Sequence, residues 1–131
     1  MGFMVLRNER PSGRALQENA VTAYAIAHLQ DVRVGAEIVD YIARIDGTLA
    51  PYDGQFLVHG ATPDIVEGPW PGDLVIIAFP DMERARAWYD SPAYREILPL
   101  RTENSRGVTM LVKGVEPGYR ASDFLAKLGL A

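Results

Sequence analysis

Two histidines are the side chains of this sequence best suited to move protons near neutral pH. His28 and His59 each stand near the end of an apolar segment that predicts a strand. The mouth of a pocket would lie at such strand ends, so each histidine is a candidate general acid or base. The alternative is that each imidazole is a polar group satisfied by neighbouring backbone or by solvent.

Metal and nucleotide chemistry find no support in the sequence. There is no cysteine, and the two histidines lack the His-x-His or His-x-x-x-His spacing of a metal site. Glycine-rich phosphate loops of the G-x-G-x-x-G and Walker A types are absent. We therefore expect neither a metal nor a tightly bound cofactor. The lack of cysteine also excludes disulfides and a thiol nucleophile, and it suits the reducing cytoplasm, where we expect the protein to reside.

Arg101 is the candidate for binding an anionic group. If it points into a pocket, its guanidinium can bind a carboxylate through two parallel hydrogen bonds. The alternative is a salt bridge to Glu96, to Glu103 or to a partner chain.

Aromatic and acidic residues complete the candidate substrate-binding site. Trp70 lies between two prolines, in a rigid turn that either presents the indole to a ligand or packs as a lid on the core or at a dimer contact. Tyr89 and Tyr94 could reach a pocket with their hydroxyls, although tyrosines at helical spacing are more often core residues with a solvated tip. Glu67 is a possible base, but most carboxylates are solvated surface groups.

The composition limits the class of protein. A length of 131 residues suits one domain, and 48% hydrophobic residues suffice for a core. The net charge of −4 argues against binding nucleic acid through a broad basic surface. No apolar run approaches the roughly 20 residues of a membrane span, and the N-terminal segment runs from apolar to polar, the reverse of a signal peptide.

Apolar periodicity predicts two helices among four strands. Helix 34–50 carries one stripe of Ile38, Ile42, Ile45 and Leu49. Strand 73–79 is apolar enough to be buried on both faces. The other predicted strands cover residues 21–29, 54–59 and 107–113, with 64–67 resuming the second of these after a kink. Strand 21–29 places alanines on the face toward a helix and His28 on the other.

The second helix is predicted to begin at Asp81 as N-cap and to restart after a break. Ser91 would cap the restarted helix, with Pro92 at its first position, where proline is tolerated. Capping accounts for Ser91 fully, so it is not interpreted as a nucleophile. Pro99 is expected to end this helix, which places Arg101 just beyond it. A further short helix is expected within residues 122–130.

The order strand, helix, strand, strand, helix, strand is that of an α+β ferredoxin-like fold, with an antiparallel sheet and both helices on one face. The other sheet face is apolar and must be covered. We expect a second copy of the chain to cover it, so that a homodimer encloses a barrel-like space. Residues 21–114 would form this domain, between an extension at 1–20 and a tail with a short helix at 115–131.

The sequence resembles the family known as domain of unknown function 1330, of the dimeric α/β-barrel superfamily. The resemblance covers about residues 22–114, and its most specific parts are EGPW at 67–70 and AWYDSPAY at 87–94, followed by Arg101. It implies the fold and the dimer. The family has no agreed function, and the wider superfamily contains cofactor-free monooxygenases, lactone isomerases, haem-handling enzymes and stress-related binding proteins, so it does not select a reaction.

Two functions fit these observations. The first is a cofactor-independent enzyme on a small carboxylated or partly apolar substrate, bound between sheet and helices, with a histidine moving protons. The second is a non-catalytic dimer that binds a ligand or another protein.

Overall fold

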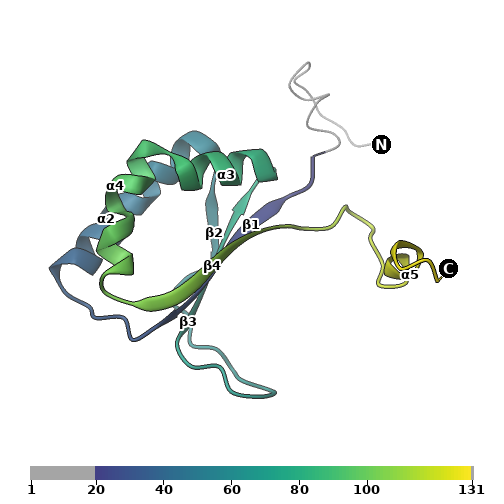
Figure 1. The fold of residues 1–131 in the computed structure, drawn as a ribbon, viewed down its shortest axis with the longest axis horizontal. Coiled ribbons are helices and arrows are strands. Elements are labelled where there is room, and N and C mark those ends of the chain that lie inside the picture. The colour runs from purple at the N-terminus through teal and green to yellow at the C-terminus, as the bar shows by residue number, and fades with distance from the viewer. Residues whose placement is uncertain (1–19, 131) are drawn as a thin grey trace.

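The computed structural model describes residues 20–130 of the chain, so the predicted extension at 1–20 lies almost wholly outside the described residues. Its strands form one antiparallel sheet in the order β2–β3–β1–β4, and helices cover one face of it (Figure 1). The predicted ferredoxin-like fold is confirmed. The strands are β1 (Ala23–Gln30), β2 (Gln55–Val58), β3 (Asp73–Phe79) and β4 (Arg106–Lys113); the α-helices are α2 (Ala36–Leu49), α3 (Met82–Asp90), α4 (Pro92–Thr102) and α5 (Asp123–Lys127).

Strand β1 lies in the middle of the sheet and separates two different environments. Ile26 pairs with Ile76 of β3 on one side and with Met110 of β4 on the other. Because side chains alternate along a strand, these three share the face away from the helices. Ala23 and Ala25 point to the helical face and are buried, as the sequence predicts. Small side chains at these positions allow α3 to pack close to the sheet.

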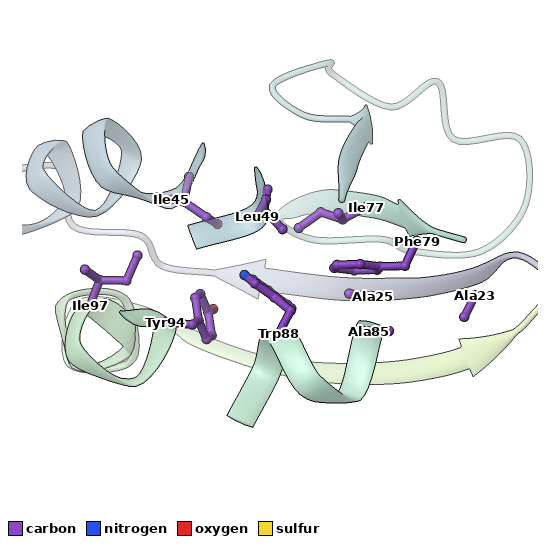
Figure 2. Packing of buried hydrophobic residues seen from close by; sticks show 10 residues of the cluster. All are labelled: Ala23, Ala25, Ile45, Leu49, Ile77, Phe79, Ala85, Trp88, Tyr94 and Ile97. Atoms are coloured by element: carbon purple, nitrogen blue, oxygen red, sulfur yellow. The ribbon is translucent and has the colours of Figure 1, made fainter. Parts of the chain in front are cut away.

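The core lies between the helices and one end of the sheet (Figure 2). Trp88 is only 2% exposed, and its ring packs 4.2 Å from that of Tyr94 and 5.4 Å from that of Phe79. Its indole Nε1–H donates to Thr48 Oγ1 at 2.9 Å, which satisfies a polar group that would otherwise be buried without a partner. Trp88 therefore joins α3 to α2 across the core.

Capping side chains set the boundary between α3 and α4. Asp81 accepts a hydrogen bond from Arg84 N at 2.7 Å, and Ser91 accepts one from Tyr94 N at 3.2 Å. Pro92 occupies the first turn of α4, where its missing N–H costs nothing. The predicted caps are confirmed.

The prediction that Pro99 ends the second helix is wrong. Helix α4 continues to Thr102 with Pro99 inside it, and Glu103 N donates to Pro99 O at 2.9 Å. Pro99 is exposed, so solvent can satisfy the Arg95 carbonyl that lacks its helical donor. Arg101 consequently belongs to the last turn of α4 and does not follow it.

Three smaller expectations also differ from the structure. Residues 64–67 form no strand, because Gly60 and Gly68 adopt positive φ values of 86° and 69° and the segment runs as a loop. Ile42 is on the predicted stripe but is 49% exposed, whereas Ile38, Ile45 and Leu49 are buried. Strand β3 is buried only toward the helices, at Ile77 and Phe79.

Apolar side chains remain exposed on the sheet face away from the helices. Val108, Met110 and Val112 of β4 are 65%, 54% and 40% exposed, and Leu57 of β2 is 58% exposed. After β4 the C-terminal segment leaves the domain and carries α5 away from it (Figure 1). Within residues 20–130, no helix combines the length and apolar character that crossing a membrane requires.

The cap at Ser91 gives a test of this boundary. Replacing Ser91 by Ala should lower the free energy of unfolding by about 1–2 kcal/mol, because Tyr94 N loses its acceptor in a buried setting. Ser122→Ala is the matched control, since Ser122 stands at the N-cap of α5 without a side-chain cap bond and is exposed. Chemical denaturation of both variants measures the difference, and equal midpoints would contradict the assignment.

Candidate functional site

A cavity of about 230 Å³ lies between the sheet and helices α2 and α4. Its walls are mainly aliphatic, with a few polar side chains. Its lining includes Ala27, Tyr41, His59, Asp73, Tyr94 and Arg101.

Small side chains on β1 leave room for the cavity. Where α3 crosses the sheet, Phe79, Trp88 and Tyr94 fill the interlayer space. Further along, β1 contributes Ala25, Ala27 and Leu29 to the cavity wall, and the two alanines are too short to fill the space toward α2. Ile42 extends into this space, which explains why it is half exposed although it lies on the apolar stripe.

Arg101 lines the cavity and is 8% exposed. It lies two turns after Tyr94 on the buried face of α4, with Ile97 between them. The salt-bridge alternative within the chain is not realised with Glu96, which instead pairs with Arg44 of α2 at 2.7 Å. Within residues 20–130, no carboxylate lies within 4.0 Å of the Arg101 guanidinium.

Two tyrosines accompany the guanidinium. The hydroxyls of Tyr41 and Tyr94 are hydrogen-bonded at 2.7 Å, and the Arg101 Cζ lies 5.9 Å from the Tyr41 ring centroid. Burial, followed by the nearby Tyr94, raises the pKa of the Tyr41 hydroxyl above its ordinary value, so Tyr41 is neutral at physiological pH. Burial tends to lower the pKa of Arg101, but the two tyrosines outweigh it and raise the pKa, so the side chain stays charged.

Of the two histidines, only His59 lines the cavity. It follows β2 and is exposed, and its ring centroid lies 4.8 Å from that of Phe56, which also lines the cavity, with the two rings tilted by 34°. The imidazole is therefore accessible to solvent and borders the cavity, as a group that exchanges protons there must.

His28 and Trp70 form a separate cluster on the opposite face of the sheet. Their rings stack at 4.1 Å, and His28 Nε2–H donates to the carbonyl of Pro71. Gly72 makes this approach possible, since its φ is +94° and a Cβ there would lie 2.1 Å from Leu29 O. The structure thus does not bring His28 or Trp70 together with His59 and Arg101.

The remaining candidates lie outside the cavity wall. Tyr89 packs 5.6 Å from the Tyr94 ring, but its outer side faces Arg95, whose Cζ is 4.7 Å from its centroid. Glu67 is exposed in the loop before β3.

Tyr41 is a cavity residue that was not among the candidates predicted from the sequence. Its signal was available, because Tyr41 stands three residues after Ile38 and four before Ile45 on helix 34–50. Asp73 was also omitted, and it is the only carboxylate among the residues lining this cavity. In the described part of the chain, no group of three or more His, Cys, Asp or Glu side chains is placed to hold a metal ion.

Comparison with known proteins identifies a matching family model and similar solved structures. The family model described as Domain of unknown function (DUF1330) matches residues 22–115. The methylated RPA0582 protein is 14% identical to this chain, and another structure describes RPA0582 as a protein of unknown function from Rhodopseudomonas palustris. Its TM-score is 0.57, with 86% of this chain and 96% of that chain covered.

A second solved structure carries a functional description. SnoaB, a cofactor-independent oxygenase from Streptomyces nogalater, is 16% identical with a TM-score of 0.53, covering 77% of this chain and all (100%) of its own. Both structures belong to the dimeric α/β-barrel superfamily, and at these identities they show the fold alone. No curated protein matches the chain.

Proposed function

The chain belongs to the family described as domain of unknown function DUF1330, and we propose that it is a homodimer that binds a small, partly apolar molecule in the cavity between its sheet and helices. One observation carries this proposal. The cavity combines aliphatic walls with a small number of polar groups, the composition that small-molecule sites share. The absence of cysteine suits the cytoplasm as the place of action.

The uncovered sheet face supports the dimer. Val108, Met110 and Val112 form an exposed apolar row on β4, and Ile26 and Ile76 continue it across β1 and β3. A sheet face of this kind is stable in water only when another layer covers it. A second copy supplies the same face and buries both at once.

We further propose that the cavity is a catalytic site. We place His59 as the general acid or base, because it is the histidine on the cavity wall, and we take Arg101 as the group that holds the substrate. The description of SnoaB as a cofactor-independent oxygenase shows that this fold accommodates chemistry without a cofactor in that protein. The second candidate is ligand binding without conversion, since the cavity holds no nucleophile with an adjacent base among its described residues.

Filling the cavity tests the binding proposal. Ala27→Leu should abolish the thermal stabilisation that small aromatic and aliphatic probes give the wild type, because the added side chain occupies the space between β1 and α2. Ala93→Leu, at an exposed position of α4, is the matched control and should keep the response. A wild type that responds to no probe in the panel would contradict a small-molecule site.

A charge on the sheet face tests the dimer. Met110→Arg should convert a dimer to a monomer in light scattering, because burying a guanidinium between two apolar sheets is strongly unfavourable. Ala87→Arg adds the same charge to the exposed side of α3 and should leave the dimer intact. A monomeric wild type at micromolar concentration would refute the dimer.

The two histidines provide a matched pair for the catalytic part. With a probe that the wild type converts, His59→Ala should lower kcat by about 10²-fold or more, the usual size of a general acid–base contribution. His28→Ala removes an imidazole from the other sheet face and should keep activity. Equal rates in all three proteins exclude a histidine mechanism, and binding without conversion favours the non-catalytic candidate.

A further inference from the structure

The geometry points to a monocarboxylate with an apolar body as the ligand of this cavity, its carboxylate bound by Arg101 beside the Tyr41–Tyr94 hydroxyl pair. This inference rests on the proposed small-molecule function and specifies the chemical class that the cavity selects. It follows from three features of the cavity: an uncompensated charge, a set of hydrogen-bond donors, and a single acidic residue elsewhere on the wall.

The first feature is the charge of Arg101. A buried charge is normally paired, because leaving it without a counter-ion costs far more than exposing it to water. Neighbouring acidic side chains have other partners: Glu96 binds Arg44, and Glu37 accepts from Asn104 Nδ2 at 2.7 Å. With no carboxylate of the described residues within 4.0 Å of its guanidinium, Arg101 leaves this end of the cavity positive. An anionic ligand supplies the missing charge.

The second feature is the hydrogen-bonding character of the same end. A guanidinium has five N–H donors and no acceptor. In the Tyr41–Tyr94 pair, one hydroxyl donates to the other, so one O–H hydrogen remains for a third group. The Ser105 hydroxyl is already used, donating to Arg101 O at 2.7 Å. The polar end therefore offers donors, and the group that satisfies them must be an acceptor, as a carboxylate is.

The third feature limits the ligand to one carboxylate. Most of the wall is aliphatic, as at Ala27, Ile38 and Val75, and its few other polar side chains include His59 and Thr109. The other charged wall residue is Asp73, whose carboxylate repels a second negative group. A ligand that fits both ends is an apolar body with one terminal carboxylate.

Phenylacetate and phenylacetamide test this inference, because they share their shape and differ in charge. Isothermal titration calorimetry should show that the wild type binds phenylacetate at least tenfold more tightly than phenylacetamide. Arg101→Met should remove this preference while leaving phenylacetamide binding unchanged. Arg95→Met, on the exposed side of the same helix and paired with Asp90, is the matched control and should bind as the wild type does.

Three further measurements test whether Arg101→Met remains folded, whether the geometry of the guanidinium matters, and which type of anion the cavity prefers. Thermal melting of unliganded Arg101→Met should show a midpoint at or above that of the wild type, since a buried charge without a partner is removed. Arg101→Lys, which keeps the charge but loses the two-pronged donor geometry, should retain only part of the preference. Phenyl phosphate should bind more weakly than phenylacetate, and tighter binding of the phosphate would overturn the carboxylate assignment.

The outcomes separate this inference from the proposed function. If phenylacetamide binds and Ala27→Leu blocks it, the cavity is a ligand site; equal binding of phenylacetate then overturns the carboxylate inference alone. If neither probe binds the wild type, both the site and its selectivity are refuted. A preference for phenylacetate that persists in Arg101→Met would show that another group holds the anion.

Discussion

The packing of Trp88 against the small side chains of β1 determines how the helical layer sits on the sheet. The indole needs a partner for its N–H and finds it in Thr48 of α2, so α3 and α2 are held at a fixed separation. Ala23 and Ala25 leave room for α3 on the sheet, while Phe79 and Tyr94 complete a tight aromatic cluster. With the layers fixed at this end, Ala25 and Ala27 of β1 leave the cavity open between the sheet and α2.

Helix α4 supplies the polar side chains at one end of the cavity. Ser91 fixes where the helix begins, and the helical repeat then places Tyr94 and Arg101 on the same face, two turns apart. Tyr41 reaches the same point from α2 and hydrogen-bonds to Tyr94. Position in the helix, rather than proximity in sequence, brings these three side chains together at one end of the cavity.

The sequence predicted local features well because local signals were unambiguous. The alternation of β1, the apolar run of β3 and the caps at Asp81 and Ser91 each depend on a few adjacent residues. The error at Pro99 arose because an exposed proline can remain in a helix when solvent satisfies the freed carbonyl. Reading the helix through Pro99 would have placed Arg101 on the stripe of Tyr94 and Ile97. The alternation of strand 21–29 already indicated that His28 lies on the face away from the helices. The position of His59 on the cavity wall could not be predicted, because β2 is short and its register shifts between Phe56 and Val58.

Alternation along β1 also links the two proposed binding events. Ala27 borders the ligand cavity, while Ile26 and His28 on either side of it point to the face assigned to the second copy. Only the thickness of one strand separates the two. In the proposed dimer, a ligand that displaces β1 changes the affinity between subunits, and by thermodynamic reciprocity dimerisation changes the affinity for that ligand by the same factor.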